Sequence, residues 1–217
     1  MPKRSIIITD LTKFKRDNPA ICLAGIDVIT GECVRPLPYL TQDFCKEHGI
    51  KPRVILSGEF LPVSNRQKPH LEDENYRLDT LKIQGTLSAI QFKQLLDKSL
   101  SKNIISGFNM EKLPNEQKEA KKIAPHPDLD KSIITIKPIK IKIIKSDYEE
   151  KYKLHLTDST GINYPFLPIV DYYFTRDINN CEEFNAALTD KEIYLRVGLG
   201  RIYNDFYWIQ INGIYIF

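Results

Sequence analysis

Residues 133–145, Ile-Ile-Thr-Ile-Lys-Pro-Ile-Lys-Ile-Lys-Ile-Ile-Lys, hold the alternation from which the fold can be argued. Apolar and polar residues follow one another with the period of two that is typical of a half-buried β-strand. Before Pro138, the apolar residues Ile134 and Ile136 share one face. After it the phase changes, and the apolar face holds Ile139, Ile141 and Ile143. Because proline cannot donate to a strand ladder, the pattern predicts a bulge or a strand that turns a corner, a device by which small barrels close.

The rest of the chain also favours strands over helices. Short runs rich in β-branched and aromatic residues predict strands at 4–9, 21–28, 32–37, 52–63, 151–156, 164–174, 193–197 and 208–217. Start and stop signals predict helices at 41–48, 114–122 and 180–188. A further helix is predicted behind Ser88 and Gln91, which have the spacing of a capping box. The sequence therefore predicts a mainly β protein with minor α content.

The length of 217 residues fits one large domain or two domains of about 100 residues each. A polar stretch from about Phe108 to Asp130 separates two strand-rich halves. We therefore expect a first domain at residues 1–125, which includes a helical insert, and a second domain at residues 126–217.

The location and the redox state follow from what the sequence lacks. It has no apolar run of about 18 residues that could span a membrane. Behind the basic start Met1–Arg4, the apolar stretch Ile6–Ile8 is shorter than the roughly 7 residues of a signal-peptide core. The four cysteines form no Cys-x-x-Cys pair, and no histidine lies at zinc-ligand spacing from them. We expect a cytoplasmic protein with reduced thiols, no metal, no cofactor and no membrane partner.

Three segments together resemble a known family. They are residues 7–13 followed by 22–27, residues 30–37, and residues 195–201 followed by 208–215. The chain is similar there to bacterial and archaeal proteins, themselves uncharacterised, that carry a dual OB-containing domain. The resemblance implies two small oligonucleotide-binding-type β-barrels joined by a helical, polar middle segment. It implies a role with nucleic acid by analogy of fold alone, and it supplies no catalytic residues.

The first candidate surface is a row of lysines in the basic segment 131–155, which holds seven Lys or Arg against three Asp or Glu. If the strands on either side of residue 147 pair, one sheet face gathers Lys140, Lys142, Lys151, Lys153 and His155. Such a row could neutralise phosphates. The alternatives are a solvated face or lysines that protect an exposed strand edge. No aromatic residue can be assigned to this face from the sequence, although binding of single strands normally needs stacking platforms as well as charge.

The second candidate is Arg35, between Val34 and Pro36 in a predicted strand. The planar guanidinium suits a phosphate or a carboxylate, so Arg35 could contact nucleic acid. An internal salt bridge to Asp27 across the predicted hairpin is an equally good explanation.

The third candidate lies near the end of the chain and comprises Arg196, Arg201, Tyr203 and Trp208. The arginines could hold phosphates while the aromatic rings stack on bases. The alternative is that Tyr203 and Trp208 belong to the core, where large aromatic residues are common. The acidic balance of this segment also counts against nucleic acid.

No catalytic motif identifies an enzyme. The acidic run Glu72–Glu74 is expected in a solvated loop, and Asp171, within an apolar run, is expected to pair with a cation or a backbone N–H. We therefore expect a non-catalytic nucleic-acid-binding protein. One alternative is a protein-interaction or regulatory module of a larger, defence-related assembly. The other is an enzyme acting on nucleic acid, which requires Arg35, Asp171 and Arg201 to converge in one pocket.

Overall fold

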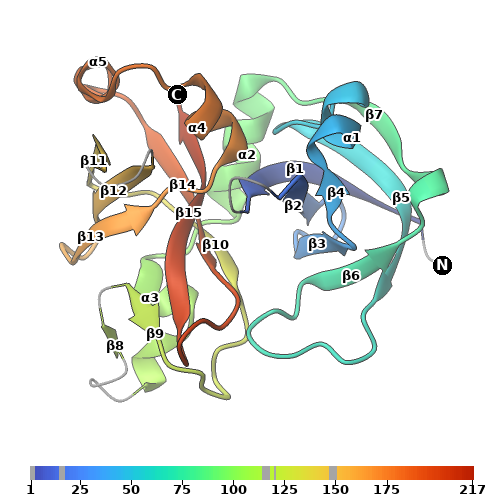
Figure 1. Ribbon diagram of the computed structural model, residues 1–217, viewed down its shortest axis with the longest axis horizontal. Coiled ribbons are helices and arrows are strands. Elements are labelled where there is room, and N and C mark those ends of the chain that lie inside the picture. Colours follow the sequence, from blue (N-terminus) through green and yellow to red (C-terminus); the bar gives the residue numbers. More distant parts are fainter. Residues whose placement is uncertain (1–2, 15–17, 114–117, 120, 147–150) are drawn as a thin grey trace. The chain divides into compact units, whose positions relative to one another are not determined.

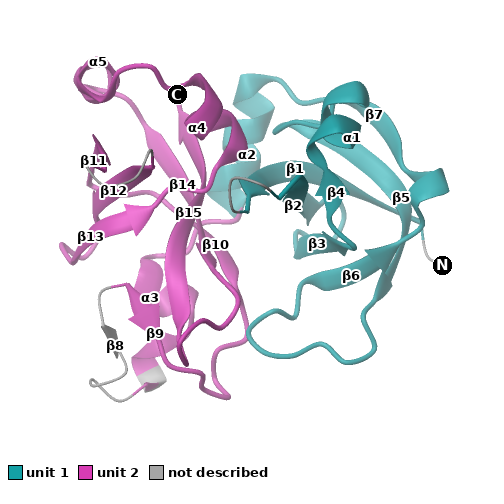
Figure 2. Cartoon of the chain, viewed as in Figure 1, with its two compact units in different colours: residues 1–98 teal, residues 99–217 magenta. Residues whose placement is uncertain are grey.

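Strands outnumber helices in the computed structural model, which describes residues 3–14, 18–113, 118–119, 121–146 and 151–217 (Figure 1). The expected mainly β class is confirmed. Two compact units divide the chain, residues 1–98 and residues 99–217 (Figure 2). Across the described residues, no helix has the length and apolar character needed to cross a membrane.

The first unit is a closed five-stranded barrel. Its strands are β1 (Lys3–Lys13), β2 (Ala20–Asp27), β3 (Cys33–Leu37), β5 (Val54–Pro62) and β6 (Asp73–Tyr76). They pair in the ring order β1-β2-β3-β6-β5, and β5 returns to β1. The β3–β6 pairing is parallel and the others are antiparallel. This is the Greek-key arrangement of an OB barrel.

Smaller elements surround this barrel. The short strand β4 (Leu40–Thr41) pairs with β2, and β7 (Lys82–Thr86) pairs with β5. The unit also contains α1 (Gln42–Glu47), the 3-10 turn η1 (Leu78–Thr80) and α2 (Ala89–Lys98). The predicted caps are present: Thr41 Oγ1 accepts a hydrogen bond from the Phe44 N–H, and Ser88 and Gln91 form the capping box before α2.

Buried ion pairs join β3 to β6, where the ring closes. Arg35 lies opposite Asp73 in the parallel register, and its Nε donates to Asp73 Oδ1 over 2.6 Å. Its Nη1 lies 3.4 Å from Glu72 Oε1. Burial alone would lower the pKa of Arg35, but the nearby Glu72 and Asp73 carboxylates raise it above its ordinary value. The expectation that Arg35 contacts nucleic acid is wrong, because its side chain is 5% exposed and bound to these carboxylates rather than to Asp27.

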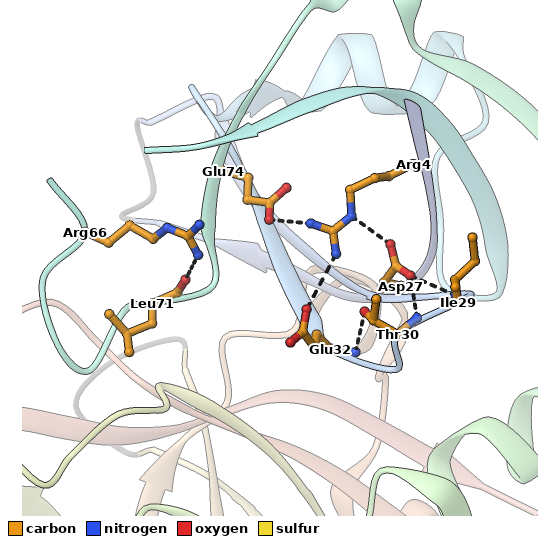
Figure 3. A network of polar contacts seen from close by, with 8 residues as sticks. All are labelled: Arg4, Asp27, Ile29, Thr30, Glu32, Arg66, Leu71 and Glu74. Carbon is orange, nitrogen blue, oxygen red and sulfur yellow. Dashed lines mark hydrogen bonds and ion pairs between the residues drawn. The ribbon is translucent and has the colours of Figure 1, made fainter. Parts of the chain in front are cut away.

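A second ionic network joins β1, β2 and β6 (Figure 3). Arg4 Nε donates to Asp27 Oδ2 over 2.8 Å, and Arg4 Nη1 donates to Glu74 Oε1. Asp27 Oδ1 also accepts the backbone N–H groups of Ile29 and Thr30, each over 2.8 Å. Burial disfavours the carboxylate, but the Thr30 N–H, the Arg4 guanidinium and the Ile29 N–H outweigh it and lower the pKa of Asp27.

These two networks correct the expectation for the acidic run Glu72–Glu74. The run is buried rather than solvated, and β6 begins within it. Arg35 and Arg4 supply the positive charges that make this burial tolerable, since an unpaired buried carboxylate is costly.

The second unit repeats the same ring order with a broken first strand. Its strands are β10 (Ile133–Ile136), β11 (Lys140–Lys145), β12 (Tyr152–Thr157), β13 (Asn163–Pro168), β14 (Ile193–Leu199) and β15 (Tyr207–Ile216). β10 pairs with β14, whereas β11 pairs with β12. The strand therefore changes partner at Pro138, which confirms the predicted corner.

Antiparallel pairs β12–β13 and β14–β15 continue this ring. Ile169, the residue directly after β13, closes the ring by a parallel bridge to Ile211 of β15. The next residue supports this bridge, because the Val170 N–H donates to the Ile211 carbonyl over 2.9 Å. The chain between β13 and β14 forms α4 (Tyr172–Asp177) and α5 (Cys181–Ala186). Asn185 of α5 covers the edge of β11, because its side-chain amide accepts from the N–H and donates to the carbonyl of Ile143.

The segment before β10 also belongs to this unit. It contains α3 (Ile104–Gly107), the 3-10 turn η2 (Met110–Lys112), β8 (Lys118–Glu119) and β9 (Lys122–Ile123), which pairs with β15. The helix predicted at 114–122 is therefore wrong at 118–119 and at 122, while 114–117 and 120 lie outside the described residues.

The boundary between the compact units falls at 98/99 rather than at the predicted 125/126. The reason lies in the core of the second unit. That core includes apolar side chains that precede residue 126, which are Ile104, Phe108, Met110, Leu113 and Ile123.

Removing the Arg35 guanidinium should destabilise the first unit strongly. We expect Arg35→Ala to lower the free energy of unfolding by about 3–5 kcal/mol, because it leaves buried carboxylates without a counter-charge. Urea unfolding followed by circular dichroism measures this. The control is Arg77→Ala, whose ion pairs with Glu59 and Asp79 are exposed and screened, so that a far smaller loss is expected. Equal losses in the two variants would show that Arg35 does not hold β3 to β6.

The depressed pKa of Asp27 makes a pH-dependent contribution to stability. A carboxyl whose folded pKa is below its ordinary value of 3.8 stabilises the fold above that pH, and the contribution is lost as pH falls through the folded pKa. We expect Asp27→Asn to lower the free energy of unfolding at pH 7 by about 1–3 kcal/mol. The gap between the two proteins should shrink below pH 3.8. A gap that is constant between pH 7 and pH 3 would contradict this.

Candidate nucleic-acid interface

The outer face of the β11–β12–β13 sheet gathers the lysines predicted for it. Lys142 lies opposite His155 in the β11–β12 register, and Lys153 lies opposite Ile144, two residues beyond Lys142. Residues directly opposite each other, and those two apart along a strand, point to the same face. Lys140, Lys142, Lys153 and His155 therefore share one face, whose reverse packs Ile141, Ile143, Leu154 and Leu156 into the core.

Lys151 and Ile139 lie just outside the regular part of this sheet. Lys151 is exposed and comes directly before β12, and its carbonyl accepts the Ser146 N–H over 2.8 Å. Ile139 was expected on the apolar face, but it lies between Pro138 and β11 and is 67% exposed. The inward alternation therefore begins only at Ile141.

An aromatic side chain that the sequence did not assign also lies on this face. Phe166 occupies an irregularity of the β12–β13 register, with a positive φ of 57° and half of its surface exposed. Its ring is edge-on to the His155 ring, with centroids 4.4 Å apart. The left-handed backbone turns this residue outward, where a regular strand would alternate.

Two further lysines extend the face toward β15. Lys121 Nζ lies 5.7 Å from the centre of the Phe166 ring, and Lys122 Nζ lies 4.2 Å from the centre of the Phe206 ring. Lys122 is placed by its pairing with Trp208 at the start of β15. Lysines and aromatic rings thus alternate from β11 to the β14–β15 connection.

That connection is a tight hairpin tip. Tyr203 and Phe206 exchange backbone hydrogen bonds of 2.9 and 3.3 Å, and Asn204 and Asp205 between them have positive φ values of 49° and 63°. This is the geometry of a type I′ turn. Trp208 Nε1 donates to the Tyr203 carbonyl over 3.0 Å and so ties the tip to β15.

The hairpin exposes three of the four side chains of the third candidate. Tyr203 is 66% exposed and is not part of the core, Trp208 is partly exposed, and Arg201 is exposed. Burial raises the pKa of Tyr207, and the charge of the nearby Arg201 guanidinium partly offsets this rise. Arg201 therefore lies close to the base of the hairpin.

We call the combined area the basic-aromatic surface. It is defined by Lys121, Lys122, Lys140, Lys142, Lys153, His155, Phe166, Arg201, Tyr203 and Trp208.

Arg196 is not on this surface. Its side chain is 2% exposed, and Nη1 donates to Thr135 Oγ1 over 2.8 Å. Leu195 and Val197 pack into the core from one face of β14, and the other face is covered as well, because six consecutive residues from Tyr194 to Leu199 are buried. The prediction that Arg196 binds nucleic acid is therefore wrong.

Asp171 has the backbone partners that its burial requires. It is the N-cap of α4, where Oδ1 accepts the N–H groups of Tyr173 and Phe174, and Oδ2 accepts the Ile214 N–H over 3.2 Å. The backbone-bonded alternative is confirmed. Within the described ranges, no group of three or more His, Cys, Asp or Glu side chains is placed to hold a metal ion.

Comparison with known proteins gives one match over nearly the whole chain and several distant ones. A family model described as the dual OB-containing domain matches residues 6–214. No curated protein matches the chain. The p204 HINb domain is 10% identical with a TM-score of 0.40, and the match covers 97% of this chain and 96% of that one.

Two other solved structures are similar at the same level. A murine DNA-binding protein bound to double-stranded DNA is 8% identical with a TM-score of 0.33, covering 100% of this chain and 98% of that one. A replication protein A heterotrimer bound to single-stranded DNA is 8% identical with a TM-score of 0.37, and the match covers 97% of this chain and 48% of that one. Scores this low carry no inference about a ligand. The family model matches the sequence itself from residue 6 to residue 214, so the chain belongs to the dual OB-containing domain family.

Proposed function

We propose that the second unit binds single-stranded nucleic acid along the basic-aromatic surface and that it does so without catalysis. The observation that carries the proposal is the row of lysines beside an exposed Phe166 on the outer face of β11, β12 and β13. These strands correspond to the first three of an OB barrel. OB folds bind oligonucleotides on the face of the second and third strands and on the loops that flank it.

The charge on this face is available for phosphates. Lys140 and Lys142 are exposed and Lys153 is partly exposed. Among the described residues, none of the ion pairs involves these three lysines. The arginines of the first unit differ, because Arg4 and Arg35 are bound to buried carboxylates. The lysines of this face can therefore exchange counterions for phosphates.

Stacking platforms lie beside that charge. Phe166 presents an exposed ring whose position is fixed from one side by the His155 ring, and Tyr203 presents another on the hairpin tip. Aromatic rings bind bases without sequence preference, because every base has a π-face. The surface therefore suits a strand with unpaired bases and little sequence selectivity.

Replacing two lysines of the face should weaken binding and reduce its salt dependence. For single strands the logarithmic salt slope changes by about 0.7 per phosphate contact, so Lys142→Gln with Lys153→Gln should reduce it by about 1.4. Titration of a fluorescent DNA or RNA oligonucleotide at several salt concentrations measures the slope. The matched control, Lys93→Gln with Lys98→Gln, removes the same charge from α2 of the first unit. If both pairs change the slope equally, the effect is net charge rather than contact.

Replacing Phe166 should weaken binding without changing the salt slope. We expect Phe166→Leu to cost about 1–3 kcal/mol of binding free energy, since a stacked base is lost while every lysine remains. The matched control is Phe14→Leu, which alters a partly exposed aromatic residue of the first unit. Unchanged affinity for Phe166→Leu would remove the stacking platform from the proposal.

The protein-interaction alternative predicts a different outcome. If neither DNA nor RNA binds at low salt, and a complex captured from the native host survives nuclease treatment, the surface serves a protein partner.

A further inference from the structure

We propose that the tip of the β14–β15 hairpin stacks on the end of a duplex, so that the preferred ligand is a single strand joined to a double-stranded end. This inference rests on the proposed function and names its ligand more closely. The observation behind it is that the basic-aromatic surface has two parts with different chemistry. The strand face carries lysines and one ring, whereas the tip exposes the aromatic Tyr203 and, directly before it in sequence, the aliphatic Ile202.

Several hydrogen bonds hold the tip of the β14–β15 hairpin in one conformation. Its type I′ turn has both backbone hydrogen bonds, and the Gly200 N–H donates to the Trp208 carbonyl over 3.0 Å. Trp208 in turn fixes the Tyr203 carbonyl and pairs with β9. A loop held at this many points loses little conformational freedom when it meets a flat surface.

The side chains of the tip suit a base pair rather than a phosphate. Ile202 is 54% exposed and Tyr203 is 66% exposed, and they are consecutive. Ile202 offers neither charge nor a side-chain hydrogen bond, so a phosphate gains nothing from it. Apolar side chains of this kind do pack against base steps in DNA-bending proteins. A terminal base pair presents the same flat face without the cost of unstacking.

The charges around the tip fit the strands that flank a duplex end. Arg201 precedes Ile202, and Lys122 lies over the ring of Phe206 on the other side of the turn. Asp205 is the acidic residue of the turn, and its positive φ explains the residue type, since Asn, Asp and Gly tolerate that conformation. The carboxylate is thus a consequence of the turn rather than a feature of the ligand site.

A strand leaving the duplex end would continue onto the lysine face. Lys122 contacts Phe206 at the tip, and its neighbour Lys121 lies over Phe166, which contacts His155 opposite Lys142. The contacts are continuous from the tip to β11. A free single strand uses only part of this path, whereas a junction uses both parts.

The test compares three ligands at one salt concentration. They are a single strand of about twelve nucleotides, a blunt duplex, and a duplex that carries the same single strand as an overhang. We expect the overhang duplex to bind about tenfold more tightly than the single strand, as stacking on one further flat surface implies. A 2-aminopurine at the terminal pair should change its fluorescence on binding. Both measurements use the unmodified protein.

Variants then locate the effect. Ile202→Ser should lower the preference for the overhang duplex and leave affinity for the single strand within about twofold, because Ile202 is not one of the stacking platforms for the single strand. Asp205→Gly keeps the turn and removes its carboxylate, so affinity for the overhang duplex should rise about twofold to threefold. Ile29→Ser, at an exposed site of the first unit, is the control and should change nothing.

Each result separates this inference from the proposed function. Equal affinity for the overhang duplex and the single strand would overturn the inference and leave the proposed function standing. Tip variants that weaken single-strand binding as much as junction binding would also overturn it. Binding to none of the three ligands would overturn both.

Discussion

The structure depends on one constraint: with the strand order found here, each barrel closes only where its third and fifth strands meet in parallel. In the first unit that seam is β3 against β6, and Arg35 spans it to Asp73 and Glu72. The ionic groups are buried because the seam itself is buried, so each needs its partner in place. In the second unit the corresponding seam is the bridge between Ile169 and Ile211, which belongs to an apolar core. The parallel seam thus carries buried ion pairs in the first barrel and apolar packing in the second.

This difference accounts for the contrast between the paired arginines of the first barrel and the exposed lysines of β11 and β12. Arg4 and Arg35 compensate buried carboxylates, and β1 is buried without interruption from Ile6 to Thr12. The lysines of β11 and β12 face outward because isoleucine and leucine fill the opposite face. The accessible lysines of β11 and β12 therefore follow from the way the core of the second barrel is built.

The local features of the fold could be predicted from the sequence, whereas the fate of the arginines could not. The change of alternation at Pro138 predicts the corner between β10 and β11, and the spacing of short-range hydrogen-bonding residues predicts the caps at Thr41 and Ser88. Arg35 meets Asp73 from 38 positions away, and Arg196 meets Thr135 from 61 positions away. Local periodicity contains no information about such partners. The exposed position of Phe166 could not be predicted for a related reason, since an irregularity in the pairing of β13 with β12 turns this residue outward.

The corner at Pro138 also explains why the lysine face stays open. A straight strand would continue beside β14, where both faces of the sheet are buried. By changing partner, β11 leaves that sheet and pairs with β12, and its remaining edge is covered at Ile143 by the Asn185 amide of α5. A side-chain amide can satisfy a backbone N–H and a carbonyl without another strand. The Asn185 amide therefore covers the edge of β11 and leaves the lysine face of the sheet uncovered. The alternation that marks the fold in the sequence is therefore also what places Lys140 and Lys142 in solvent.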